Sequence, residues 1–78
     1  MARRRLTIQQ LRKILKSFGV SEDKSRGKGS HTLFYRGNLS YPMPARREVL
    51  PCYVKGCREK FGLMPGDGIS DDEFYSRM

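Results

Sequence analysis

The sequence contains one histidine, two cysteines and no tryptophan, and it has half as many acidic residues as basic ones. Two cysteines and one histidine fall short of the four ligands of a structural zinc site. No apolar run approaches the roughly 18 residues that a membrane-spanning helix needs. Arg3, Arg4 and Arg5 lead into a polar–apolar repeat rather than the apolar core of a signal peptide. We therefore expect no metal or organic cofactor, no membrane association and a cytoplasmic location.

What the chain has in excess is positive charge. Its 78 residues include 16 Lys and Arg against 8 Asp and Glu, a net charge of +8. Such an excess points to an anionic partner, of which nucleic acid is the commonest. Hydrophobic residues still make up 37% of the chain and recur periodically, so we expect one folded domain over residues 1–78 that begins with a basic arm at residues 1–5.

Residues Thr7 to Phe18 are predicted to form an amphipathic helix. Thr7 and Gln10 have the spacing of a capping box, and Gly19 suits the left-handed position that commonly ends a helix. The apolar residues recur at helical spacing on one side, as Ile8, Leu11, Ile14, Leu15 and Phe18 do.

The middle of the chain indicates a turn followed by a β-hairpin. The glycines of residues 27–30 suit a tight connection, and residues 31–36 are rich in β-prone side chains. Gly37-Asn38 offers a two-residue loop before Leu39, Tyr41 and Met43 alternate with other residues. Pro42 and Pro44 cannot donate to a ladder, so this second strand is predicted to be an edge strand or to end at Met43.

A second helix is predicted from a signal that starts at Glu48, with Pro51 in the first turn and Gly62 at the end. Cys52 and Cys57 within it would lie roughly 8–9 Å apart, too far for a disulfide, and are expected to be reduced. Its apolar face is predicted to carry Leu50, Val54, Cys57, Arg58 and Phe61. After a loop over residues 63–69, Ser70 and Glu73 have the spacing of a capping box for a short helix ending near Arg77.

This order of elements predicts an α+β fold in which helices cover one face of a small antiparallel sheet of two or three strands. The other face would be open to solvent or ligand. His31, Leu33 and Tyr35 share one face of a regular strand, and the sequence leaves open whether that face is the packed one.

Chemistry is predicted around the turn that precedes the strand. A histidine at the end of a basic, glycine-containing segment can remove the proton from an RNA 2′-OH while cations and backbone N–H groups hold the phosphate. On the residues alone, a packing or surface role for a lone histidine is the commoner one. The residues that converge within this segment are Lys24, Arg26, Lys28, Gly29, Ser30 and His31.

Several of these segments together resemble the HicA toxin family. The resemblance covers about residues 6–61 and rests on Phe18-Gly19-Val20, the Gly29-Ser30-His31 signature before an apolar strand, Pro42-Met43-Pro44 and the second helix. Residues 69–74, an Ile-Ser pair followed by acidic residues and Phe, are also similar to the family pattern. The resemblance implies a double-stranded-RNA-binding-like fold of helix, three-stranded antiparallel sheet and helix. It also implies that His31 is the catalytic residue of an mRNA-cleaving toxin, which a HicB antitoxin binds and blocks.

The resulting hypothesis is a metal-independent, ribosome-independent endoribonuclease with His31 as the acid-base residue. Arg26 and Lys28 would hold RNA phosphates, and Gly29 and Ser30 would allow close approach of the backbone. A more acidic antitoxin would cover the basic face. The alternatives are a non-catalytic double-stranded-RNA-binding module and, ranked last, a DNA-binding adaptor.

Overall fold

The computed structural model describes residues 6–24 and 31–78. Three helices, one 3₁₀ turn and five strands make up this part of the chain, and no helix in it is long and apolar enough to cross a membrane. In chain order they are β1 (Leu6–Thr7), α1 (Ile8–Ser17), β2 (Ser21–Asp23), β3 (His31–Arg36), β4 (Leu39–Pro44), β5 (Glu48–Val49), α2 (Pro51–Lys60), η1 (Pro65–Asp67) and α3 (Asp71–Tyr75).

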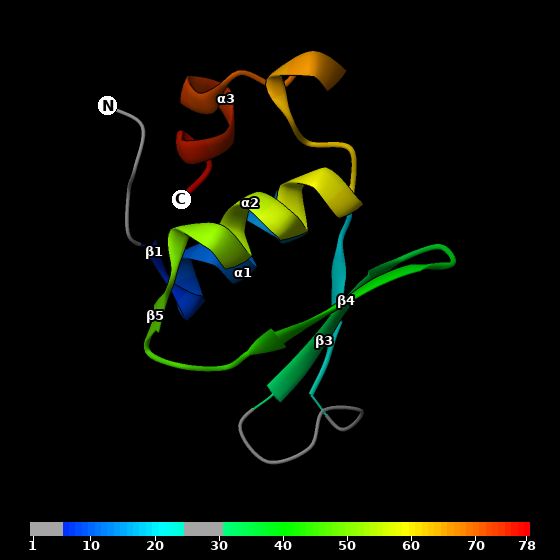
Figure 1. Ribbon diagram of the computed structural model, residues 1–78, viewed down its shortest axis with the longest axis vertical. Coiled ribbons are helices and arrows are strands. Elements are labelled where there is room, and N and C mark those ends of the chain that lie inside the picture. Colours follow the sequence, from blue (N-terminus) through cyan, green and yellow to red (C-terminus); the bar gives the residue numbers. More distant parts are fainter. Residues whose placement is uncertain (1–5, 25–30) are drawn as a thin grey trace.

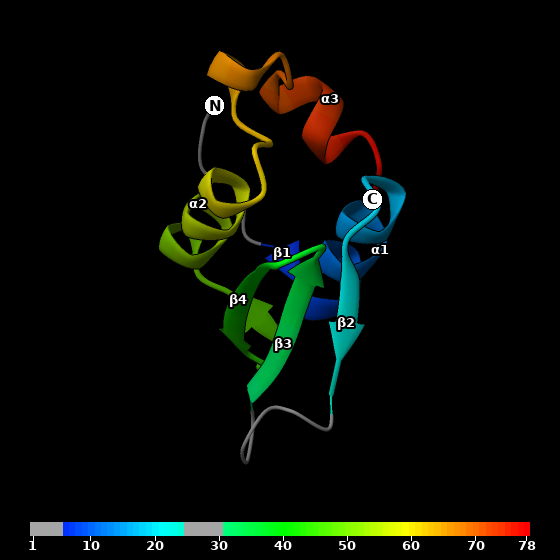
Figure 2. The same cartoon turned by 90° about the vertical axis from the view of Figure 1, so that its right-hand side faces the viewer.

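The main sheet is antiparallel in the order β2-β3-β4, and α1 and α2 lie together on one side of it (Figures 1 and 2). This arrangement confirms the predicted α+β class with a three-stranded sheet. Phe34 of β3 and Met43 of β4 point to the helices and are buried. Of the two alternatives predicted from its prolines, β4 is an edge strand and continues to Pro44 rather than ending at Met43. Gly37 takes a positive φ of 62° in the two-residue loop before it.

Helix α1 begins at the predicted capping box. The Thr7 hydroxyl accepts a hydrogen bond from the Gln10 backbone N–H (3.1 Å), and the Gln10 side-chain oxygen accepts one from the Thr7 N–H (3.0 Å). These two reciprocal hydrogen bonds satisfy backbone N–H groups that have no partner within the helix. Gly19 follows the helix with φ 83°, as predicted. The buried face of α1 carries Ile8, Leu11, Ile14 and Leu15.

The start of the second helix is where the sequence-based prediction is wrong. Glu48 and Val49 form strand β5, which pairs with β1, and α2 begins only at Pro51. A residue before proline is driven out of the helical region, and Leu50 accordingly has ψ 148°. Leu50 is also 50% exposed rather than part of the apolar face. The β1–β5 pair was not predicted, because strands of two residues have no alternation to detect.

The C-terminal segment is held against α2 by the buried Arg58. Its guanidinium donates to the backbone oxygens of Leu63 (2.8 Å) and Ile69 (3.1 Å) and to the carboxylate of Asp71 (2.8 Å). It also lies 4.3 Å from the ring centroid of Phe74. One side chain therefore joins the loop and α3 to the core.

Helix α3 is shorter than predicted and ends at Tyr75 rather than near Arg77. The Ser70 hydroxyl caps it by accepting from the Glu73 N–H at 3.0 Å. The carboxylate of Glu73 pairs with Arg77 at 3.0 Å instead of returning to Ser70, so only half of the predicted capping box forms.

Candidate nucleic-acid interface

His31 is the first residue of β3 and its side chain is exposed. Within β3 the buried residues are Thr32 and Phe34, so His31, Leu33 and Tyr35 lie on the face of the sheet that α1 and α2 do not cover. The sequence left open whether this face is the packed one, and the structure shows that it is not. The imidazole can be reached from solvent without distortion of the strand.

The remaining predicted site residues, Arg26, Lys28, Gly29 and Ser30, lie outside the described residues. Their predicted convergence on His31 stays a prediction. Lys24 belongs to the described chain and is exposed immediately after β2. Because Asp23 pairs with Leu33, Lys24 follows β2 at the end of the sheet where β3 begins.

Two further cations, which were not predicted from the sequence, lie at that end. Pro44, the last residue of β4, pairs with His31, so the chain that continues into Arg46 and Arg47 leaves the sheet beside the start of β3. Both arginines are exposed. The signal was present in the sequence: a two-residue loop at Gly37-Asn38 fixes the hairpin register and hence the partner of His31.

Arg46 and Arg47 line a hollow of about 510 Å³ together with the start of α1. Arg12 also reaches this hollow, but its Nε donates to both carboxylate oxygens of Glu22 at 2.9 and 3.0 Å. Glu22 accepts a further bond from the buried Thr32 hydroxyl at 2.7 Å. The negative charge of Glu22 is thus compensated, and Arg46 and Arg47 remain as exposed cations at this corner.

Charge is distributed unevenly between the two ends of the molecule. The strand register brings Lys24, Arg46 and Arg47 to the end of the sheet where β3 begins. Helix α3, with its acidic first turn, lies at the opposite end of the molecule (Figures 1 and 2). A polyanion is attracted to the first end. The exposed imidazole lies at the attractive end.

No hydrogen bond joins the imidazole of His31 to another side chain in the described parts of the chain. The imidazole is therefore exposed and has no side-chain hydrogen-bond partner among residues 6–24 and 31–78 that would orient it. Residues 6–24 and 31–78 also contain no group of three His, Cys, Asp or Glu side chains that could hold a metal ion.

The two cysteines are free thiols, as expected, and differ in environment. Cys52 is exposed, whereas Cys57 is fully buried between α2 and the core. Burial raises the pKa of the Cys57 thiol to about 12, which keeps it protonated and unsuited to act as a nucleophile. Neither position supports cysteine catalysis.

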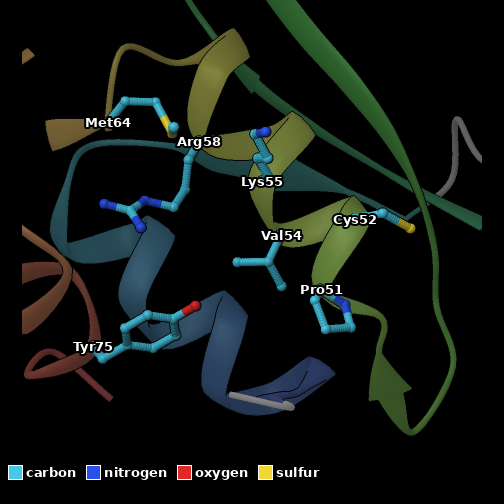
Figure 3. A pocket seen from close by; sticks show the side chains of 7 residues that line it. All are labelled: Pro51, Cys52, Val54, Lys55, Arg58, Met64 and Tyr75. Atoms are coloured by element: carbon cyan, nitrogen blue, oxygen red, sulfur yellow. The ribbon is translucent and has the colours of Figure 1, made fainter. Parts of the chain in front are cut away.

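A separate cavity of about 270 Å³ lies between α2 and the C-terminal segment (Figure 3). Its lining includes Val54, Lys55, Met64 and Tyr75, together with the stem of Arg58. The guanidinium of Arg58 donates hydrogen bonds to backbone oxygens of the C-terminal segment and to the carboxylate of Asp71. We interpret this cavity as the seam left where the C-terminal segment docks.

Comparisons of the chain with protein-family models, with curated proteins and with solved structures find no match. The resemblance to the HicA family therefore stays a prediction from the sequence, and the case for function rests on the site itself.

Proposed function

We propose that this protein is a HicA-like toxin: an endoribonuclease that cleaves mRNA without a metal ion and uses His31 as its acid-base residue. The observation that carries the proposal is the exposure of His31 on the open face of the sheet, at the cationic end of the molecule. A phosphodiester drawn to Lys24, Arg46 and Arg47 would arrive beside the imidazole.

The ribose 2′-OH of RNA is the nucleophile. The protein therefore needs to supply only proton transfer and positive charge that stabilises the phosphoryl oxygens. In the proposed reaction neutral His31 takes the proton of the ribose 2′-OH, and the 2′ oxygen attacks the adjacent phosphorus. The bond from phosphorus to the 5′ oxygen breaks, and that oxygen receives a proton from the imidazolium or from a nearby Lys or Tyr. The products are a 2′,3′-cyclic phosphate and a 5′-OH.

The charge that develops on the phosphoryl oxygens needs donors held in place. Arg26 and Lys28, and the backbone N–H groups of Ser30 and His31, are proposed for this role because they precede or include the histidine in the chain. Gly29 would let the RNA backbone approach closely. Arg46 and Arg47 join the proposed set because the register of β3 and β4 brings them to the same end.

The order α1, β2, β3, β4, α2 supports a fold similar to that of double-stranded-RNA-binding domains, with a helix on either side of a three-stranded sheet in sequence. We also propose a HicB-type antitoxin as partner in the cytoplasm. An acidic protein would complement the net charge of +8 and would block the site by covering the basic end.

A non-catalytic RNA-binding module is the second candidate. It is favoured by the lack of a side-chain hydrogen bond to the imidazole within the described residues, since catalytic bases are commonly oriented by a third group. Such a module would use the same exposed face and cations to bind RNA without cutting it.

Cleavage and binding measured separately distinguish these two functions. The wild-type protein and its His31→Ala variant would be incubated with single-stranded and duplex RNA in the presence of a chelator. We expect cleavage by the wild type, loss of cleavage in the variant, and RNA affinity within a few-fold in both, because His31 is exposed and its removal leaves the core intact. Binding without cleavage by either protein would favour the module, and equal cleavage by both would refute the assignment of His31.

A further inference from the structure

The open face of the sheet carries a second feature besides His31, a shallow hollow near the β3–β4 loop. Its volume is about 370 Å³, within the range of small-ligand sites. Both strands of the hairpin and the end of β2 contribute to it. The lining residues are Asp23, Leu33, Tyr35, Gly37, Asn38, Leu39 and Ser40.

Tyr35 is the most prominent side chain in this hollow. It is 39% exposed, which is high for a large aromatic residue in the central strand of a sheet. The register explains its exposure, because Tyr35 pairs with Ser21 on one side and with Ser40 on the other. Two serines are too small to cover the ring, so its surface remains open to a ligand.

The chemistry of the lining suits a nucleobase better than a phosphate. Tyr35, Leu33 and Leu39 supply an aromatic and aliphatic surface, and Asn38 and Ser40 supply polar groups that can meet the edge of a base. The described lining includes one carboxylate and no cation, which disfavours an anion at this position. The exposed cations Lys24, Arg46 and Arg47 lie instead at the other end of β3.

His31 and Tyr35 are separated by four residues on one face of one strand. This spacing corresponds to about 13 Å along β3. A strand of RNA laid along β3 would place a phosphate at the cationic end beside His31 and a base a few nucleotides away over Tyr35. The division of charge along the face, with exposed cations at one end and an aromatic surface without a cation in its described lining at the other, matches such an orientation.

We propose that this hollow is a base-binding subsite in which an unpaired base of the RNA stacks on Tyr35. The inference rests on the proposed function and adds a substrate requirement to it. A base can stack on a protein side chain only when it is free of its own duplex, so the enzyme selects single-stranded segments and positions them for His31.

The test measures binding in the His31→Ala background, where the RNA stays intact. The probe is a single-stranded oligoribonucleotide that carries 2-aminopurine, whose fluorescence reports stacking on an aromatic ring, and the comparison is a duplex of the same sequence. Tyr35→Leu should weaken binding of the single strand about tenfold and abolish the fluorescence change, with little effect on the duplex. Tyr35→Phe keeps the ring and should bind as the parent does.

Tyr53→Leu is the matched control, since it makes the same change on α2 rather than on the open face. It should leave the affinity for the single strand unchanged. Unchanged affinity in Tyr35→Leu would overturn the inference, as would an equal loss for single strand and duplex. Cleavage assays on the wild-type and His31→Ala proteins decide the proposed function separately, because both proteins retain Tyr35.

Discussion

His31 and Pro44 are paired across strands β3 and β4, and this pairing brings the chain that leads to Arg46 and Arg47 to the end of the sheet where His31 lies. Arg46 and Arg47, two and three residues beyond Pro44, are exposed at the same end of the sheet. The backbone oxygen of Arg47 accepts from Ile8, so truncation of the two side chains leaves this backbone contact in place.

Replacement of both arginines by alanine should weaken RNA binding without loss of the fold. Each lost phosphate contact should reduce the slope of log affinity against log salt by about 0.7 for single strands. Lys55→Ala with Lys60→Ala removes the same charge from exposed positions on α2 and serves as the control. If the control pair reduced the slope as much, binding would depend on net charge alone and not on the end of the sheet near His31.

Arg36→Leu should destabilise the protein by about 1–3 kcal/mol. The Arg36 guanidinium donates to the backbone oxygen of Phe18 (3.3 Å) and to that of Phe61 (2.5 Å), the residues that cap the C-terminal ends of α1 and α2. The positive charge also opposes the negative ends of both helix dipoles. Urea denaturation gives the free energy of unfolding, and a loss below about 0.5 kcal/mol would contradict this role.

Arg58→Met should cost more, about 2–4 kcal/mol. Methionine fills the apolar part of the site but leaves the oxygens of Leu63 and Ile69 without their donor. Asp71→Asn should cost less than about 1 kcal/mol because the Asp71 side chain is 56% exposed. We expect hydrogen exchange to rise in residues 63–78 of Arg58→Met. Equal effects of the two variants would show that the ion pair, rather than the backbone contacts, holds the segment.

Alkaline pH should destabilise the protein through Cys57. Its thiol has a pKa of about 12 when folded, against an ordinary value of 9.0, because burial disfavours the thiolate. The unfolded chain therefore releases a proton at lower pH than the folded one. Stability from this group is fully present below pH 9 and is lost as pH rises from 9 towards 12, by up to about tenfold in the folding equilibrium per pH unit.

The comparison of unfolding at pH 8 and pH 10 checks this prediction. Cys57→Ala should be less stable overall but should lose less stability between the two values than the wild type does. Cys52→Ala, which removes an exposed thiol, should keep the full alkaline loss. The pKa of Tyr41 is also raised, first by burial and then by the negative charges that Cys57 and Cys52 acquire; the burial contribution, which is the largest, is common to all three proteins. An identical alkaline loss in Cys57→Ala and wild type would contradict the assignment.

The sequence predicted what depends on local pattern. The Thr7–Gln10 capping box, the left-handed Gly19 and the alternation through Phe34 are each encoded within a few residues, and each is found in the structure. The same alternation predicted that His31 and Tyr35 lie on one face of the strand. Which face is packed depends on the other core elements and could not be predicted from the strand alone.

What the sequence analysis missed depends on contacts between distant segments. Arg46 reaches the end of the sheet near His31 only through the hairpin register. Arg36 was predicted only as the end of a strand. Its hydrogen bonds to the C-terminal ends of two helices join segments far apart in the sequence, so residue spacing could not predict them. Arg58 was placed correctly on the apolar face of its helix, but its carbonyl partners come from a loop that carries no periodic signal.

Removal of the 2′-OH proton of RNA by His31 can be followed through the chemistry of the fragment ends. RNA would be incubated in chelator with wild-type protein or with His31→Ala, and the end groups of the fragments analysed. We expect fragments ending in 2′,3′-cyclic phosphate and 5′-OH with the wild type, none above background with the variant, and none from RNA with 2′-O-methyl groups throughout. Equal amounts of the same fragments from wild type and His31→Ala would show that His31 does not transfer this proton.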